Sequence, residues 1–155
     1  EGLNLLMDSG VSLVNQTPMV QGVNDDPEVL AELFSKLSYI GVPPYYVFLC
    51  RPTLGNETYS VPVERGYEIF EKSRTLCSGL AKRARLVMSH QSGKIEVVGL
   101  TEDQIFFKYA RSADKDNNAR FLAFYRNPEA CWFDDYKEAL EEFSLFSPGA
   151  KVGCA

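Results

Sequence analysis

The chain has 155 residues, of which 45% are hydrophobic and 24% charged, a composition that is typical of a globular domain. Its net charge of −5 and sequence pI near 4.9 argue against a dedicated nucleic-acid binder and against anchoring on an anionic membrane. No run approaches the ~20 apolar residues of a membrane span, and no signal-peptide layout opens the chain. We therefore expect a cytoplasmic protein with no membrane and no nucleic acid among its partners.

The first half of the sequence predicts helices that alternate with strands. The expected elements are a helix end over residues 3–7, a strand within 11–20, a helix over 27–40, a strand over 45–50 and a helix over 61–79. Asp26 is a natural N-cap and Pro27 a natural first helical residue, and Gly41 ends that helix. Strands and helices that alternate at this spacing predict parallel βα units.

The second half predicts short strands over residues 85–88, 95–100, 104–110 and 121–125, the last three in an antiparallel meander. Asp134 or Asp135 is expected to cap a final amphipathic helix that carries Tyr136 and Phe143. We divide the chain into residues 1–82, residues 83–146 and a frayed tail over residues 147–155.

The cysteines and the histidine exclude most metal sites. The four cysteines, at positions 50, 77, 131 and 154, are too far apart in sequence to predict a zinc or iron–sulfur site and too sparse for a disulfide scaffold. We interpret them as reduced thiols. The single histidine, His90, excludes most histidine-cluster sites.

Two blocks of sequence resemble a known family. They are NQTPMVQGVND at residues 15–25 and PYYVFLC at residues 44–50. A helix that begins at Val61 and ends at the sequence SGLA, residues 78–81, follows them. Together these segments are similar to the C-terminal half of the lysine 2,3-aminomutase family of radical S-adenosylmethionine (SAM) enzymes. The resemblance covers roughly residues 5 to 98, and the remainder does not match.

The resemblance implies an α/β fold, namely the C-terminal part of a partial (β/α) TIM-like barrel followed by a small antiparallel β extension and a terminal helix. The first two strands here would be the fifth and sixth of the barrel. The missing N-terminal half-barrel would be a partner, and its CxxxCxxC loop would hold a 4Fe-4S cluster that cleaves SAM. Because this sequence has no CxxxCxxC, we expect the chain to be inactive alone. An uncovered strand edge also favours a homo-oligomer.

Lys94 is the sharpest candidate for chemistry. In the family, pyridoxal phosphate (PLP) is bound covalently by a lysine in a glycine-rich loop after the barrel, and Lys94 stands at that place behind Ser92 and Gly93. The loop departs from the pattern, because it has one glycine and appears one residue shorter. A plain turn lysine between two strands is the alternative interpretation.

Further candidates come from the same resemblance. Gln16 is a plausible hydrogen-bond partner for SAM, with Asn15 beside it, and His90 could contact a cofactor; structural hydrogen bonds or simple exposure are the alternatives. Phe48 lies on a strand of which one face should look into the barrel.

Two substitutions bear on the substrate. The lysine-binding aminomutases place aspartates where this chain has Arg51 and Met88, so charge complementarity for a lysine side chain is lost. Arg51 could instead hold a substrate carboxylate or phosphate, or be a surface residue at a strand end.

Three functions therefore stay open. The chain is the cofactor-loop part of an aminomutase-like enzyme, or part of a relative that has lost PLP and lysine specificity, or chiefly an interaction module over residues 95–146 that joins subunits.

Overall fold

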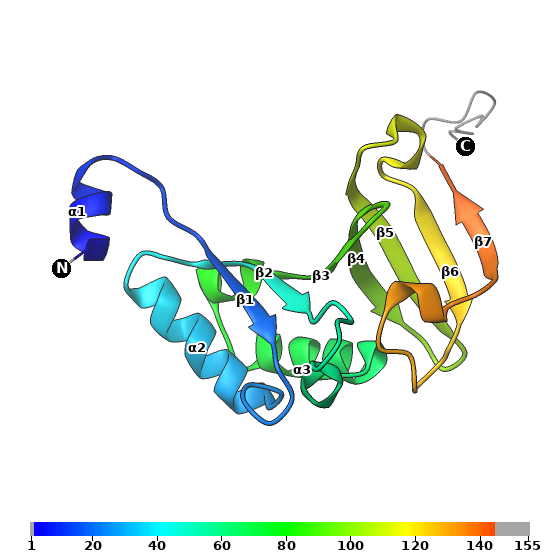
Figure 1. The fold of residues 1–155 in the computed structure, drawn as a ribbon. Coiled ribbons are helices and arrows are strands. Elements are labelled where there is room, and N and C mark those ends of the chain that lie inside the picture. The colour runs from blue at the N-terminus through cyan, green and yellow to red at the C-terminus, as the bar shows by residue number, and fades with distance from the viewer. Residues whose placement is uncertain (1, 145–155) are drawn as a thin grey trace, which may run out of the picture.

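One seven-stranded sheet runs through the chain, with its strands in sequence order from β1 to β7 (Figure 1). The computed structural model describes residues 2–144. The strands are β1 (Asn15–Met19), β2 (Pro44–Leu49), β3 (Arg85–His90), β4 (Gly93–Leu100), β5 (Gln104–Ser112), β6 (Phe121–Tyr125) and β7 (Ala139–Phe143). The helices are α1 (Gly2–Asp8), α2 (Pro27–Tyr39) and α3 (Val63–Thr75), with short 3-10 helices η1 (Glu57–Tyr59), η2 (Gly79–Arg83), η3 (Lys115–Asn117) and η4 (Phe133–Asp135).

The predicted start of α2 is confirmed. The Asp26 carboxylate accepts hydrogen bonds from the backbone N–H groups of Glu28 (2.9 Å) and Val29 (3.2 Å). Pro27 occupies the first turn, where no helical hydrogen bond needs its missing N–H. Gly41 follows the helix with φ +81°, a conformation that residues with a β-carbon disfavour. Local sequence therefore sets both ends of α2.

Strands β1 and β2 are parallel, as the alternation predicts, β3 is also parallel to β2, and α2 and α3 lie on one face of the three strands (Figure 1). The core of this half lies between that face and the helices, and its members include Met19, Leu30, Phe34, Val47, Leu49, Val63, Ile69, Phe70, Leu86 and Met88. Among the described residues, no helix covers the opposite face of β1–β3, which we call the open face (Figure 1). Exposed Gln16 and half-buried Phe48 lie on it.

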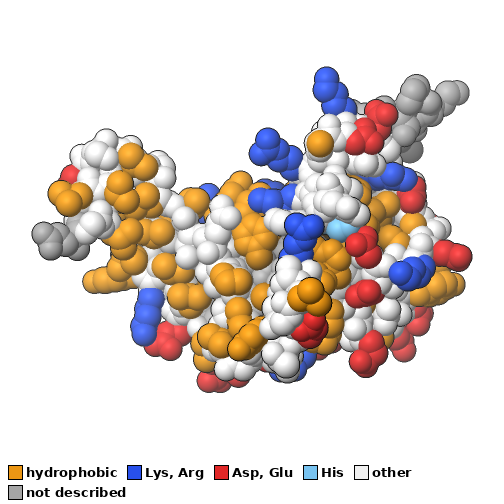
Figure 2. Space-filling model, in the orientation of Figure 1, with side chains coloured by type: hydrophobic (Ala, Val, Ile, Leu, Met, Phe, Trp, Pro, Cys, Tyr) orange, Lys and Arg blue, Asp and Glu red, His pale blue; other side chains and the backbone are white. Residues whose placement is uncertain are grey.

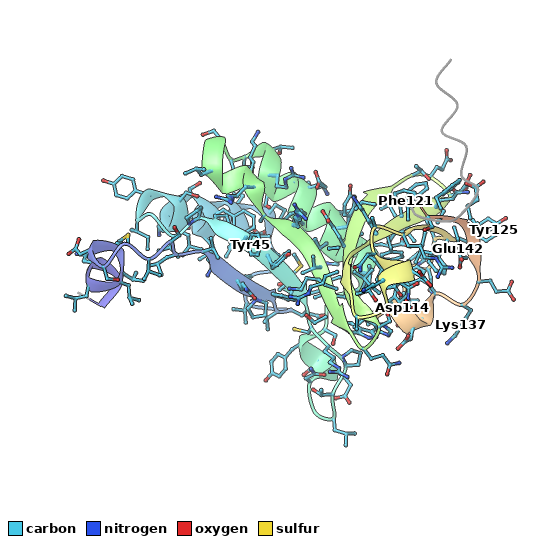
Figure 3. All side chains as sticks on the ribbon, turned by 90° about the horizontal axis from the view of Figure 1, so that it is seen from above. Tyr45, Asp114, Phe121, Tyr125, Lys137 and Glu142 are labelled. Carbon is cyan, nitrogen blue, oxygen red and sulfur yellow. The ribbon has the colours of Figure 1, made fainter. Side chains whose placement is uncertain are left out.

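From β3 onward, every pair of neighbouring strands is antiparallel, which confirms the predicted meander and extends it to β7. On its buried face, the Phe107 ring lies 5.1 Å from that of Tyr136, 5.3 Å from Phe133 and 5.8 Å from Phe124, measured between centroids. Figure 3 shows the outer end of the meander, marked by Phe121, Tyr125 and Glu142, well away from Tyr45 of β2. The meander thus has an aromatic core of its own.

A partly buried ion pair joins the two halves. Glu64 in the first turn of α3 is 2% exposed, and its carboxylate accepts hydrogen bonds from Arg126 Nε (2.9 Å) and from the backbone N–H of Asn127 (2.7 Å). The Val63 N–H donates to the carbonyl of Ala130 at 2.8 Å. The segment after β6 is therefore fastened to the start of α3.

The predicted terminal helix is wrong. Residues 133–135 form η4 and residues 139–143 form β7, which pairs with β6. The two carboxylates expected to cap a helix point elsewhere. Asp135 accepts from the N–H groups of Cys131 (3.0 Å) and Trp132 (2.9 Å), and Asp134 contacts His90. Pairing with the free edge of β6 satisfies the backbone of 139–143 instead.

The coarse fold class is confirmed as mixed α/β, with an open sheet and few helices. Strands from both sides of residue 82 belong to the same sheet. The predicted domain boundary at residue 82 stays a prediction. The tail at 147–155 and Cys154 lie outside the described residues, and Cys50, Cys77 and Cys131 are free thiols. Within residues 2–144, no helix is long and apolar enough to cross a bilayer.

Candidate cofactor site

Lys94 lies near the start of β4 and projects over the open face. Its Nζ atom lies 4.1 Å from the ring centroid of Tyr46 and 5.2 Å from that of Phe48, both on β2. Because β3 separates β4 from β2, the side chain reaches across a strand to these rings. Aromatic faces attract a cation electrostatically. Within residues 2–144, no carboxylate forms an ion pair with Lys94.

A shallow hollow of about 250 Å³ adjoins this lysine. We call it the Lys94 hollow, and its lining residues are Ser89, His90, Gly93, Lys94, Arg111, Ser112 and Ala113. None of them is acidic, although the chain carries a net charge of −5. Figure 2 shows Lys and Arg side chains to the left of the chain's one histidine and both acidic and basic side chains to its right. The hollow is therefore a local basic site on an acidic protein.

Gly93 brings β4 and β5 close together at this hollow. It has φ +150°, and a β-carbon at this position would lie 2.3 Å from the carbonyl oxygen of Arg111. A side chain is therefore excluded, and the pairing with β5 shifts register between Lys94 and Ile95. The glycine that the resemblance assigns to cofactor approach is thus required by the approach of β5.

His90 and Ser92 form a hydrogen-bond network on the other side of the turn. The His90 side chain is 7% exposed, with Nδ1 2.6 Å from Ser92 Oγ and Nε2 2.9 Å from Asp134 Oδ1. The backbone N–H of Ser92 donates to Nδ1 at 3.1 Å, so the tautomer with its proton on Nε2 satisfies both contacts. Ser92 Oγ lies 2.9 Å from Tyr109 OH. These contacts hold the turn that precedes Lys94, and a direct cofactor contact by His90 or Ser92 stays a prediction.

Arg51 lines a second hollow, of about 500 Å³, beyond the carboxyl end of β2. We call it the Arg51 hollow; Pro52, His90, Gln91, Cys131, Trp132, Asp134 and Asp135 complete its lining. The Asn56 amide donates to the backbone carbonyl of Arg51 at 2.7 Å, which fixes the loop. The Arg51 side chain is exposed and forms no ion pair with the described residues. His90 borders both hollows, so they are neighbours.

The other predicted site residues are split between the two faces. Gln16 pairs with Tyr46 across β1 and β2 and is exposed on the open face. Asn15 turns to the helix side, where its Oδ1 accepts from Thr17 Oγ1 at 2.5 Å. The structure therefore brings Gln16, Phe48 and Lys94 onto one face and separates Asn15 from them.

Met88 does not lie at this site. It is fully buried against the helices and pairs with Ile95 of β4. A carboxylate there would face an apolar core, which is costly without partners. The side chains of β3 that face the open side are those of Val87 and Ser89, so the substrate argument from charge now rests on Arg51.

Sequence reasoning missed two residues of this site. Arg111 becomes a neighbour of Lys94 only through the pairing of β4 with β5. Tyr46 is not among the site residues predicted from the sequence, yet its ring contacts the Lys94 amine. Its hydroxyl donates to that of Tyr45 at 3.2 Å, and this hydrogen bond, followed by burial, raises the pKa of Tyr46 above the usual value. Tyr46 therefore presents a neutral ring. No local signal places Arg111 beside Lys94, because a bulge shifts the register of β4 and β5 there, whereas Tyr46 could have been found from its alternation with Val47.

Three relatives show what the chain is similar to. A protein of Aquifex aeolicus named provisionally as an L-lysine 2,3-aminomutase is 52% identical over 143 residues, which are 92% of this chain. The L-lysine 2,3-aminomutase of Clostridium subterminale is 47% identical over 48% of the chain, and the glutamate 2,3-aminomutase of Clostridioides difficile is 33% identical over 60%. The chain belongs to the lysine 2,3-aminomutase family. The family predicted from the sequence is thus confirmed, while the predicted extent was too short, because the 143-residue match reaches well beyond residue 98.

The match covers only part of each aminomutase relative. The chain spans 38% of the length of the Aquifex protein, 18% of the Clostridium subterminale enzyme and 22% of the Clostridioides difficile enzyme. No family model matches the chain. The described residues contain no group of three or more Cys, His, Asp and Glu side chains arranged to hold a metal ion.

Proposed function

We propose that this chain is the cofactor-lysine part of an aminomutase-family isomerase, and that Lys94 is the residue that binds PLP. The observation that carries the proposal is the position of its amine, over two aromatic rings of the open face and free of any carboxylate among residues 2–144. Lys94 also stands where the family resemblance puts the cofactor lysine.

The surroundings of Lys94 fit such a cofactor. The rings of Tyr46 and Phe48, which are tilted 60° to each other, offer apolar contacts for a pyridine ring. The Lys94 hollow, which Lys94 itself helps to line, provides space and positive charge. In the family, PLP when bound carries the substrate's amino group during its migration.

The rest of the enzyme would cover the open face. On this proposal, β1, β2 and β3 with α2 and α3 are the distal βα units of a partial barrel, and the open face is its interior. A missing half-barrel would pair with the outer edge of β1 and bring the 4Fe-4S cluster and SAM. Gln16, exposed beside Tyr46, would then be in reach of SAM.

Arg51 is the residue that we propose binds the substrate carboxylate. Its guanidinium is exposed in the Arg51 hollow and unpaired among the described residues, and its fork of donors suits a carboxylate. It replaces an aspartate that, by the resemblance, binds the substrate ammonium in lysine aminomutases. The relatives' names include both lysine and glutamate as substrates. We therefore propose that the substrate is not L-lysine bound in its usual pose.

A second function is favoured by the turn before Lys94. Strands β3 and β4 are joined by only Gln91 and Ser92, and Gly93 serves the contact with β5. A tight turn with one committed glycine is unlike a glycine-rich cofactor loop. On this observation, the chain belongs to a branch that keeps the fold and has lost PLP.

Covalent trapping separates the two functions. The neutral amine of Lys94 condenses with the aldehyde of PLP and releases one water, and borohydride then delivers hydride to the C=N carbon to give a stable secondary amine. We expect peptide mapping by mass spectrometry to place most of the label on Lys94 at low PLP concentration.

Two variants make the result specific. Lys94→Arg keeps the charge and should lose the label, while Lys108→Gln removes an exposed lysine of the adjacent strand β5 and should not change labelling of Lys94. Label distributed over many lysines, with Lys94 not preferred, would contradict the first function and support the second.

A further inference from the structure

Two basic residues that form no ion pair among the described residues line the Lys94 hollow. Lys94 and Arg111 are directly opposite each other across β4 and β5. Like charges in this arrangement are destabilising. Within residues 2–144, neither forms an ion pair, and no acidic side chain lines the hollow. Two cations placed this way indicate that an anion belongs between or beside them.

The backbone around Arg111 is held rigidly. Its carbonyl lies so close to Gly93 that no side chain fits there. On its other side, Ser112 Oγ donates to the Ser92 carbonyl at 2.7 Å, and the Ser112 N–H donates to Asn118 Oδ1 at 2.8 Å. The base of the Arg111 side chain is therefore fixed relative to Lys94, while the side chain itself is exposed.

One hydroxyl at the hollow is uncommitted. Ser89 lies on β3 directly opposite Lys94, on the other side from Arg111, so Ser89, Lys94 and Arg111 form a row across three strands. Ser89 is exposed, and no described residue accepts or donates a side-chain hydrogen bond to it. A guanidinium and a hydroxyl that flank an amine suit a phosphate monoester, which accepts several charge-assisted hydrogen bonds.

We propose that Arg111, assisted by Ser89, forms an anion subsite beside Lys94 that holds the phosphate group of the cofactor. This rests on the proposed function, because the phosphate is that of the PLP bound at Lys94. The subsite explains why a chain with a net charge of −5 concentrates positive charge at this place.

The first test compares two aldehydes that differ in the phosphate. PLP and 5′-deoxypyridoxal share the reactive aldehyde, and neither can close an internal hemiacetal. We expect borohydride trapping at Lys94 to reach half of its maximum at a concentration of PLP on the order of tenfold lower than that of 5′-deoxypyridoxal, since one charge-assisted bond is at stake. Equal concentrations for the two aldehydes would overturn the subsite while leaving the proposed function intact.

Arg111→Gln assigns the preference to the arginine. In this variant, the PLP concentration that gives half-maximal trapping at Lys94 should rise to the value for 5′-deoxypyridoxal. The value for 5′-deoxypyridoxal itself should not change. Arg83→Gln is the matched control, because Arg83 is exposed on η2 and lines neither the Lys94 hollow nor the Arg51 hollow. A preference that survives Arg111→Gln would overturn the assignment.

The second test does not need Lys94. In Lys94→Met, phenylglyoxal modification of Arg111 should be slowed severalfold by inorganic phosphate, as followed by mass spectrometry. Protection of Arg111 with no trapping at Lys94 in the unaltered chain would support the subsite and refute the proposed function. No protection of Arg111 by phosphate would refute the subsite.

Discussion

Two buried tyrosines in the same aromatic cluster differ in what their hydroxyl groups contact. The Tyr109 hydroxyl lies 2.9 Å from Ser92 Oγ and takes part in the network that reaches His90. The Tyr136 hydroxyl is buried and has no hydrogen-bond partner among the described residues. A buried hydroxyl without a partner costs roughly 1–3 kcal/mol, while a satisfied one contributes about 1 kcal/mol. The two residues should therefore respond in opposite ways to loss of the hydroxyl.

We expect Tyr136→Phe to leave the free energy of unfolding unchanged or to raise it by about 1 kcal/mol, and Tyr109→Phe to lower it by about 1 kcal/mol. Urea denaturation of both variants beside the unaltered chain measures the two changes. A clear loss of stability in Tyr136→Phe would show that its hydroxyl has a partner, such as an ordered water.

Alkaline pH provides a second readout for Tyr136. Burial, with a smaller contribution from Glu64, raises the pKa of Tyr136 above its unfolded value near 10. The folded state thus favours the neutral phenol, so this stabilisation is fully present below pH 10 and is lost as pH rises through the folded pKa. Tyr136→Phe should make the unfolding midpoint less sensitive to pH above 10.

At the residue scale, the sequence predicts features that depend on adjacent residues, but it does not predict which residues meet across neighbouring strands. The cap at Asp26 and the stop at Gly41 depend on adjacent residues, and both were predicted correctly. The placing of Arg111 beside Lys94 depends on the register of β4 and β5, which a bulge shifts. Met88 faces the helices and not the open face, because successive residues of a strand point to opposite faces of the sheet.

At the element scale, the segment after β6 shows how a tertiary partner overrides a local pattern. Residues 135–143 carry apolar side chains at helical spacing after an acidic cap, and the sequence alone predicts a helix there. The free edge of β6 offers a ladder of backbone hydrogen bonds, and Tyr136 finds a place against Phe107. Asp135 caps the preceding turn instead. None of these partners is adjacent in sequence.

The ion pair between α3 and the end of β6 should be the strongest polar link between elements. Glu64→Gln should lower the free energy of unfolding by about 1–3 kcal/mol, because it leaves Arg126 partly buried without its charge partner. Exposure of about a third of the Arg126 side chain keeps the loss below that of a fully buried pair.

Glu32→Gln is the control for this measurement. It removes an exposed ion pair with Lys36 within α2, and little or no change in the free energy of unfolding is expected because solvent screens that pair. Thermal or urea unfolding of both variants gives the comparison. Equal losses for the two substitutions would mean that Glu64 does not fasten the halves together.

At the scale of the whole molecule, helices cover one face of β1–β3, and the outer edge of β1 has no neighbouring strand among the described residues. In the described chain, β1 has a neighbour only on the β2 side, so its outer edge carries unpaired backbone groups. Apolar side chains of α1 and the segment after it are exposed, among them Leu5 at 67%, Leu6 at 48% and Val11 at 50%. Figure 2 shows these hydrophobic side chains gathered over α1 and the chain that follows. In a longer aminomutase-family protein, this region is where further structure would attach.

The isolated 155-residue chain should therefore self-associate as its concentration rises. Unpaired strand edges and exposed apolar surface both favour association with another copy. Size-exclusion chromatography with light scattering should show a mass above the 17.4 kDa of one chain at high concentration.

Val11→Lys combined with Val14→Lys places charge beside the β1 edge and should shift the equilibrium to the monomer. Val23→Lys alters a more exposed valine, at 67%, on the loop before α2 and should have little effect. A mass of one chain at every concentration would contradict this prediction. It would mean that the edge of β1 needs no partner and that the open face is a stable surface of this protein.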